Sequence, residues 1–276
     1  MQHRFTALSA GLILAVAAPI TQAQPAQPST YAAVNYYFVT PQNDAAYMEL
    51  TQGTGRKLIG DLMRANPKMI RYNLRRVVYP GVSFPRYNYI SSITYDGPPA
   101  EPGQQSPATR EYFQKANALR TQVGNILLRT VASTPGLSIK EGNYVVVVRN
   151  KIEPGKAGEF FDLRSNLMLP LMAARVKEGA TLGWTASTVV FPSGTSSTWD
   201  ASVGTVYKDL ASAVTAARGG GGGANQAAAF ANVHPGKSYV GYVDSIRATS
   251  KLVRRELQRV VIAVDRSSIG STSGGR

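Results

Sequence analysis

Histidine is the residue type with the widest chemistry near neutral pH, because an imidazole can transfer protons or bind a metal or haem. The 276-residue chain has two histidines, and His234 is the one beyond the amino-terminal segment, in the run Val233-His234-Pro235-Gly236. An axial haem ligand is one hypothesis for His234. The favoured alternative is an exposed loop histidine, because no acidic residue that could orient the ring lies near it in the sequence.

Other common catalytic chemistries lack their motifs. The run Gly236-Lys237-Ser238 ends like a phosphate-binding loop, but Ala231 stands where that loop requires its first glycine. The chain has no Cys, which excludes thiol catalysis, iron–sulfur clusters and cysteine-ligated zinc. The 16 acidic residues are scattered, and no serine lies in a nucleophile elbow. We therefore expect no metal and no cofactor.

Polar residues on the predicted strands are the remaining candidates for a site. Successive side chains of a strand point to opposite sides, so alternate polar residues can line one cavity. The cavity candidates are Asn73, Arg75, Asn88, Arg149, Thr185, Ser187 and Asp200. A buried Asp200 needs a cationic partner, for which Arg75 and Arg149 are the candidates. A ligand-free interface between two halves of the protein explains the same pattern.

The elements that carry these residues occur twice. Moving residues 70–96 forward by 112 positions places aromatic residues on aromatic residues. The matched pairs include Tyr72 with Trp184, Tyr79 with Phe191, and Tyr87 with Trp199. Further along, the offset becomes 130, and Tyr112 matches Tyr242. Such long copies indicate two folding units, in which symmetric core packing explains the repeated aromatic residues.

Each copy predicts strand, helix, strand, strand and helix, with a short last strand. The predicted strands are 34–40, 69–79, 87–95 and 131–133, then 144–150, 182–191, 199–207 and 260–264. The predicted helices are 45–65, 107–129, 157–177 and 242–258. Gly53, Gly55 and Gly60 weaken the first helix, and Pro170 is expected to kink its counterpart. The order is that of a ferredoxin-like βαββαβ unit.

We therefore predict an α+β fold with two tandem ferredoxin-like modules, 34–136 and 137–264, joined as an intramolecular pseudo-dimer in one α+β barrel. The offset grows because the second module has a Gly-rich insertion at about 218–237. Residues 1–23 combine His3 and Arg4 with an apolar run and small residues, which predicts a signal peptide and a periplasmic or secreted protein. Residues 24–33 are expected to be a linker, and 265–276 a disordered tail.

The chain is strongly basic, with a formal net charge of +14. This charge favours attraction to anionic surfaces, such as lipid headgroups or cell-wall polymers of the envelope. Nucleic-acid binding is not expected, because the basic residues are spread along the chain without a recognition motif. No segment after the signal peptide is apolar enough to cross a membrane.

The run VRNKIEPGKAGEF at 148–160 resembles the first strand and helix start of dimeric α+β barrel proteins, among them antibiotic-biosynthesis-monooxygenase-like, EthD-like and NIPSNAP-like families. This superfamily contains cofactor-free oxygenases, isomerases, haem enzymes and ligand-sensing modules, so the resemblance implies a fold and no catalytic set. Three hypotheses follow: a barrel that binds a small apolar or anionic molecule, a cofactor-independent oxygenase or isomerase, and a basic structural or interaction protein of the envelope.

Overall fold

The computed structural model describes residues 29–80, 86–100, 105–192, 198–218 and 224–269. The predicted signal peptide, the first half of the predicted linker (24–28), the glycine run at 219–223 and the last seven residues of the predicted tail (270–276) lie outside these ranges. Within the described part, no helix is both long enough and apolar enough to cross a membrane.

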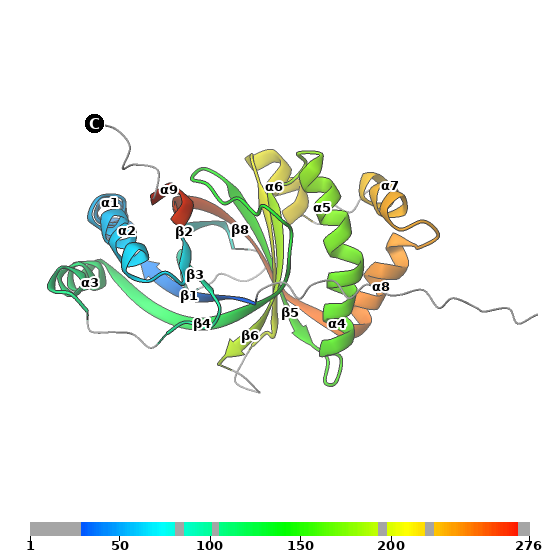
Figure 1. Cartoon of the computed structure of the whole chain (residues 1–276), viewed down its shortest axis with the longest axis horizontal. Helices are drawn as coiled ribbons and strands as arrows, with labels where there is room; N and C mark the ends of the chain where they lie inside the picture. Colours follow the sequence, from blue (N-terminus) through cyan, green and yellow to red (C-terminus); the bar gives the residue numbers. More distant parts are fainter. Residues whose placement is uncertain (1–28, 81–85, 101–104, 193–197, 219–223, 270–276) are drawn as a thin grey trace, which may run out of the picture.

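Eight antiparallel strands form a closed barrel in the order β1-β3-β2-β8-β5-β7-β6-β4 (Figure 1). The first half supplies β1 (Thr30–Val39), β2 (Met69–Tyr79), β3 (Tyr89–Asp96) and β4 (Arg120–Ser133). The second half supplies β5 (Tyr144–Ile152), β6 (Gly183–Phe191), β7 (Ala201–Tyr207) and β8 (Ser250–Asp265). Each half keeps the ferredoxin-like strand order, so the predicted fold is confirmed. The edge strands β2 and β6 pair with β8 and β4 of the other half, which leaves no open sheet edge.

The helices lie outside the barrel, with those of the two halves on opposite sides, except that α9 of the second half lies beside the helices of the first half (Figure 1). The first half has η1 (Pro41–Asn43), α1 (Asp44–Leu50), η2 (Thr51–Gly55), α2 (Arg56–Ala65) and α3 (Pro107–Leu119). The second has α4 (Ala157–Leu163), η3 (Arg164–Met168), α5 (Leu169–Lys177), α6 (Leu210–Ala217), α7 (Ala224–Val233), α8 (Tyr239–Thr249) and α9 (Arg266–Ile269).

Each long helix contains a π-helical turn at or next to a predicted weak point, whereas Gly60 lies within the regular helix α2. The turn η2 contains Gly53 and Gly55, and η3 directly precedes the turn that contains Pro170. Proline has no N–H and its ring clashes with the carbonyl four residues earlier, so the wider π turn relieves the clash. Each long helix therefore departs from regular α-helical geometry near residues that disfavour it.

Both closing helices are shorter than predicted, because their last turns are strands. Helix α3 ends at Leu119 rather than at 129, and α8 ends at Thr249 rather than at 258. Strand β4 pairs with β1 on one side and β6 on the other, and β8 pairs with β5 and β2. These two ladders override the helical preference of the sequence, since strand formation depends on the neighbours available.

The two ends of the described chain are also more ordered than predicted. Thr30, expected in the linker, pairs with Asp96 of β3, so β1 begins four residues before the predicted start at 34. The tail, predicted as disordered from 265, instead begins with the last residue of β8 and helix α9. The Arg266 guanidinium donates to the backbone carbonyl of Met69, with an Nε–O distance of 3.1 Å, which holds α9 against β2.

The core lies between the barrel and the helices of each half. Tyr72 packs with Tyr47 and Met63 beneath the first helices. Its repeat counterpart Trp184 packs with Phe230 beneath the second set. This pair of repeated aromatic residues is therefore core packing, as predicted. The inner surface of the barrel is left for other side chains.

Leu74 tests the contribution of this outer core, because its side chain is fully buried on β2 between the barrel and the helices. We expect Leu74→Ala to lower the free energy of unfolding by about 2–5 kcal/mol through lost packing and the cavity left behind. Val78→Ala, an exposed position on the same strand, is the control and should change it by less than about 0.5 kcal/mol. Urea unfolding measures both, and equal effects would contradict this packing.

Candidate functional site

The barrel encloses a cavity of about 1050 Å³. Alternate residues of the strands line it, including Val145, Val147 and Arg149 of β5 and Asn73 and Arg75 of β2. It extends from Thr30 and Leu137, where β1 starts and β4 has just ended, to Arg149 near the end of β5. The cavity is therefore a product of strand alternation inside a closed sheet.

Five of the seven predicted cavity residues line this space. They are Asn73, Arg75, Arg149, Thr185 and Ser187. Asn73 and Arg75 come from β2, Thr185 and Ser187 from the equivalent strand β6, and Arg149 from β5. Period-two alternation on β2 and β6 is the signal that brought most of them to one cavity.

Asn88 and Asp200 do not line the cavity. The Asn88 side chain accepts the Val39 N–H at 2.9 Å and donates to the Val39 carbonyl. Asp200 accepts the Ile152 N–H at 2.9 Å and pairs with Lys151 at 3.0 Å. Each residue directly precedes a strand and holds the end of the neighbouring strand, so the two have the same structural role. The predicted pairing of Asp200 with Arg75 or Arg149 was wrong, since Lys151 is the cation beside it.

His234 also lies away from the cavity. Its Nε2 atom is 2.8 Å from the Leu167 carbonyl oxygen, and its ring packs at 4.8 Å from the Phe230 ring. The described cavity lining contains no His, Met or Cys, and no group of three His, Asp or Glu residues in the described chain could hold a metal ion. His234 is therefore not in a position to ligate a haem bound in this cavity.

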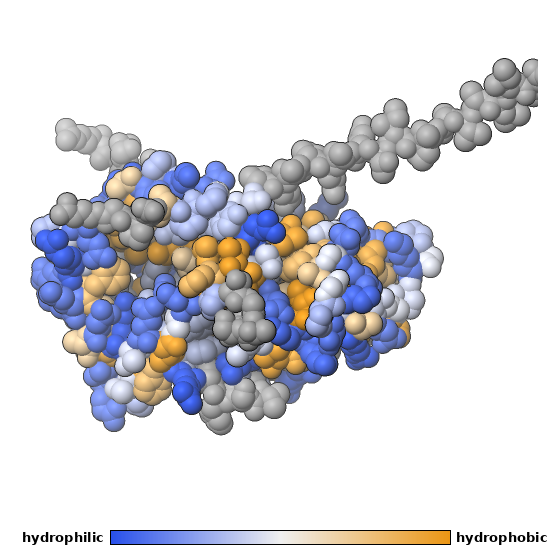
Figure 2. All heavy atoms as spheres, turned by 90° about the horizontal axis from the view of Figure 1, so that it is seen from below, coloured by the Kyte–Doolittle hydropathy of each residue, from blue (hydrophilic) through white to orange (hydrophobic). Residues whose placement is uncertain are grey.

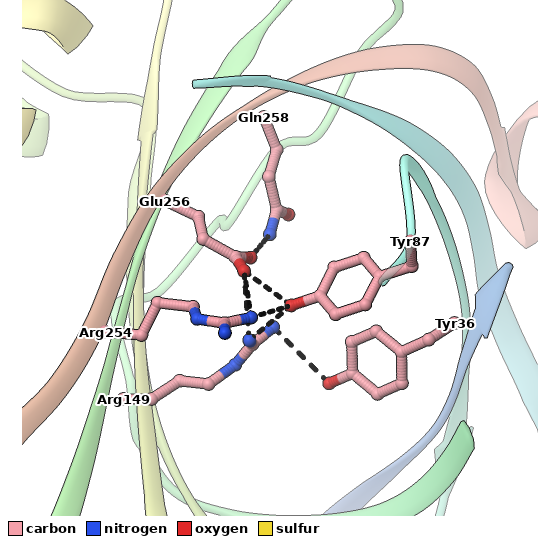
Figure 3. Close-up of polar contacts among 6 residues, drawn as sticks. All are labelled: Tyr36, Tyr87, Arg149, Arg254, Glu256 and Gln258. Atoms are coloured by element: carbon pink, nitrogen blue, oxygen red, sulfur yellow. Dashed lines mark hydrogen bonds and ion pairs between the residues drawn. The ribbon is translucent and has the colours of Figure 1, made fainter. Parts of the chain in front are cut away.

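A buried ion pair lies at the deep end of the cavity (Figure 3). The Arg149 Nη1 atom is 3.1 Å from Glu256 Oε1, and the Glu256 side chain is fully buried. Arg254 reaches the same oxygen at 3.3 Å, and Gln258 donates to Oε2 at 2.8 Å. Tyr87 donates to Glu256 and accepts from both arginines. Two guanidinium groups thus share one carboxylate, which leaves the cluster with net positive charge.

Aromatic rings surround Arg149. The guanidinium carbon is 5.3 Å from the Tyr36 ring, 5.8 Å from the Tyr87 ring and 5.1 Å from the Trp199 ring. Figure 3 shows Tyr36 and Tyr87 pointing toward the arginines from the opposite wall of the barrel. Tyr87 and Trp199 are a repeated pair, and here they enclose a cation, which corrects the prediction that the repeated aromatic residues serve core packing alone.

Burial and the neighbouring groups together determine the pKa values of Arg149 and Tyr87. Burial lowers the pKa of Arg149, but its contacts with Tyr36, Glu256 and Tyr87 outweigh this effect and raise it above the ordinary value. Burial raises the pKa of the Tyr87 hydroxyl, and its hydrogen bond to Glu256 raises it further. Arg149 therefore stays charged, and Tyr87 remains a hydrogen-bond donor near neutral pH.

Among the buried arginines of the cavity, Arg75 has the fewest contacts that compensate its charge within the described structure. Burial lowers the pKa of Arg75 to about 10, and the neighbouring Arg149 lowers it as well. The Arg75 Nε atom is buried and has no hydrogen-bond partner within the described structure. At neutral pH Arg75 remains protonated, so it is a cation that faces the cavity without a carboxylate of its own.

The charged residues are distributed unequally between the two halves. Tyr37 lies opposite Tyr89, and Asn150 lies opposite Ala201, the repeat counterpart of Tyr89. Tyr36 and Arg149 therefore occupy equivalent positions. By the 130-residue offset, Glu256 and Gln258 replace Ile126 and Leu128 of the first half. The second half supplies the ion pair, and the first half supplies apolar and aromatic side chains at the same places.

Glu256, Gln258, Arg254 and Tyr36 belong to this cluster but were not among the predicted cavity residues. The sequence predicts a helix at 242–258, and residues two apart, such as Glu256 and Gln258, lie on different faces of a helix. In a strand the same two residues lie on one face. The signal that could have found them is the alternation around Leu257, with Glu256 and Gln258 on one side. Aligned at 130, these positions match Ile126 and Leu128, which also alternate.

Replacing Glu256 tests whether it is the counter-ion of Arg149. We expect Glu256→Leu to lower the free energy of unfolding by about 3–5 kcal/mol, because Arg149 loses the partner of its buried charge. The double variant Arg149→Met/Glu256→Leu should recover much of this loss in chemical denaturation. Glu111→Gln, in an exposed pair with Lys115, is the control and should unfold like the wild type. A Glu256→Leu protein of unchanged stability would contradict the pairing.

Solved structures with the same fold include several barrel proteins. A proposed monooxygenase from Fusobacterium nucleatum superposes with a TM-score of 0.54 and 11% identity, over 86% of this chain and 94% of that chain. A proposed monooxygenase from Lactobacillus acidophilus gives 0.51 and 6%, over 87% and 97%. An anthrone oxidase-like protein gives 0.50 and 11%, over 87% and 94%. No family model and no curated protein sequence matches the chain. At such identities the likeness establishes the fold alone, a closed α+β barrel built from two ferredoxin-like halves.

Proposed function

We propose that the barrel interior binds a small organic anion with an apolar body, whose anionic group contacts Arg75 and Arg149. The observation that carries this proposal is the charge of the lining. Four arginines line the cavity, and the described lining contains no Asp or Glu. They are Arg71, Arg75, Arg129 and Arg149. Asp265 pairs with Arg71 and Glu256 pairs with Arg149 from behind the lining, whereas Arg75 and Arg129 have no ion pair in the described structure. An anion inside the barrel would therefore still meet net positive charge.

Arg75 and Arg149 differ in what they offer such an anion. Glu256 already partners Arg149, whereas Arg75 has no ion pair within the described structure. A buried cation without a counter-ion is unfavourable, so an anion bound beside Arg75 would relieve the largest electrostatic imbalance of the cavity. The hydroxyls of Ser187 and Ser92 and the amide of Asn73 also line the space and can complete the hydrogen bonds of a carboxylate or phosphate.

The rest of the lining indicates an apolar body for the ligand. Aliphatic side chains from both halves share the remaining wall with Ser and Thr residues; the larger ones include Val34, Ile90, Leu128, Leu137, Ile139, Val145, Val147, Leu169 and Val206. The volume of about 1050 Å³ is slightly above the usual range for small-molecule sites. Burial of an apolar chain against these residues would provide affinity, and the arginines would fix its orientation.

Binding is better supported than proton-transfer catalysis by a cofactor-independent oxygenase or isomerase. The described lining holds no Asp, Glu, His or Lys, and burial raises the pKa of Tyr36 above its ordinary value. These side chains supply positive charge and hydrogen-bond donors, but no general base that acts near neutral pH. The oxygenase alternative rests on fold likeness alone.

Arg75 provides the sharpest test, with decanoate as the anionic probe and decanol as its neutral counterpart. Trp199 lies over Arg149, so its fluorescence should report binding, and Trp199→Phe should remove that signal. We expect decanoate to bind more tightly than decanol. Arg75→Met should weaken decanoate binding at least about tenfold and leave decanol unchanged, because hydrogen bonds to charged groups contribute about 1.5–3 kcal/mol.

Arg110→Met is the matched control, because Arg110 is an exposed helix residue that contacts the Gln105 carbonyl outside the cavity. It should bind both probes like the wild type. Equal affinities of the wild type for decanoate and decanol would contradict an anion site. A decanoate affinity that survives Arg75→Met would remove Arg75 from it.

We also propose that the protein is exported, on the basis of the basic and apolar pattern of residues 1–23. Expression of the full chain in a Gram-negative host should yield a processed protein that begins with Gln24. Intact mass and amino-terminal sequencing measure this directly. A cytoplasmic product that retains residues 1–23 would show that the segment is not a signal peptide.

A further inference from the structure

We propose that one end of the barrel docks on an anionic lipid surface, a property separate from ligand binding in the interior. Ten large hydrophobic side chains are exposed in the described part of the chain, and eight of them lie at this end. We call these eight the apolar rim: Phe38, Val78, Tyr79, Val123, Val190, Phe191, Leu252 and Val253.

Antiparallel pairing explains why residues so distant in sequence lie together. The rim residues lie at the ends of β1, β2 and β6 and at the starts of β4 and β8. Val39 pairs with Arg120 and Phe191 pairs with Leu127, so these strand termini meet at the same end of the barrel. The cavity begins at the opposite end, near Thr30 and Leu137. The rim is therefore not part of the proposed ligand site.

Both halves contribute equivalent residues to the rim. Val78 and Tyr79 match Val190 and Phe191 at the 112-residue offset, and Val123 matches Val253 at 130. The side chains therefore surround the barrel end rather than line a groove. Soluble monomers rarely expose many large apolar side chains in one region, and such regions commonly mark contact with a partner or a membrane. A ring on a barrel end fits a flat, deformable surface better than an inserted peptide.

Basic side chains are exposed around the rim, most of them more than the acidic side chains with which they pair. In three of the ion pairs at this end the base is more exposed than the acid, and in a further pair, Lys156 with Glu159, both side chains are 50% exposed. The side-chain exposures are 51% against 24% for Arg76 and Asp44, 41% against 31% for Lys151 and Asp200, and 78% against 35% for Lys251 and Glu153. An approaching surface would therefore meet the positive members first, together with the exposed Arg86.

The positive charge around the rim favours an anionic bilayer over a second copy of the chain as the binding partner. Two copies of the chain that met rim to rim would bring like charges together, which disfavours self-association. An anionic bilayer offers both complements, since its headgroups attract the bases and its interface accepts Tyr, Phe, Val and Leu side chains. Figure 2, which looks from the side to which β6 points in Figure 1, shows apolar patches among hydrophilic residues on that surface.

Vesicle flotation with the full-length processed protein tests the proposal. We expect binding to vesicles of phosphatidylglycerol mixed with phosphatidylcholine, and little binding to phosphatidylcholine alone. The double variant Tyr79→Ser/Phe191→Ser should bind at least about tenfold less, because two apolar anchors are lost. Lys251→Glu should bind at least about fivefold less, because each basic residue near an anionic surface contributes about that factor.

Two control variants carry the same changes away from the rim. Val240→Ser removes an apolar side chain that is 65% exposed at the start of α8. Lys237→Glu reverses an exposed charge just before that helix. Both should float like the wild type. Unchanged thermal unfolding and Trp199 fluorescence of the rim variants show that they remain folded.

Three outcomes would overturn the proposal. They are a wild-type protein that does not float with anionic vesicles, equal flotation with neutral vesicles, and a rim double variant that floats like the wild type. Analytical ultracentrifugation gives a fourth, because a wild-type dimer that the rim double variant abolishes would assign the rim to a second copy of the chain.

Discussion

The pairing of the two halves through their edge strands is the constraint on which the structure depends. Strand β2 pairs with β8, and β4 pairs with β6, so each half satisfies the backbone groups that the other would leave at an open edge. The same two strand pairings close the sheet into a barrel and enclose the cavity. They also bring Arg75 of one half within the electrostatic field of Arg149 and Glu256 of the other. Without closure, these charges would be solvated, and the interior would hold no site.

Duplication alone does not explain the interior, because the two halves differ where they face it. Equivalent positions carry Tyr36 and Arg149, or Ile126 and Glu256. A buried ion pair contributes little net stability when its desolvation is included, so stability alone does not explain Glu256 and Arg149. The pair fixes Arg149 in place among the aromatic rings, while Arg75 is left to interact with whatever enters. These differences between the two halves thus give the cavity a positively charged deep end.

The sequence predicted the fold because the packing residues repeat, as Tyr72 and Trp184 do on the helix-facing side. It predicted the polar wall of β2 and β6 because alternation alone places Asn73, Arg75, Thr185 and Ser187. It could not place Glu256, since the identity of β8 as a strand depends on two neighbouring ladders far away in sequence. It also could not separate Asn88 and Asp200 from the lining, because a residue just before a strand can turn toward either a ligand or the neighbouring backbone.

The central claim is that an organic anion occupies the barrel. Native mass spectrometry of the protein purified from its own source, followed by denaturation and identification of any released molecule, tests it most directly. The charge distribution predicts a bound molecule with a carboxylate or phosphate group and an apolar portion small enough for about 1050 Å³. A neutral or cationic ligand bound in the interior, or a protein that stays empty when challenged with such anions, would contradict it.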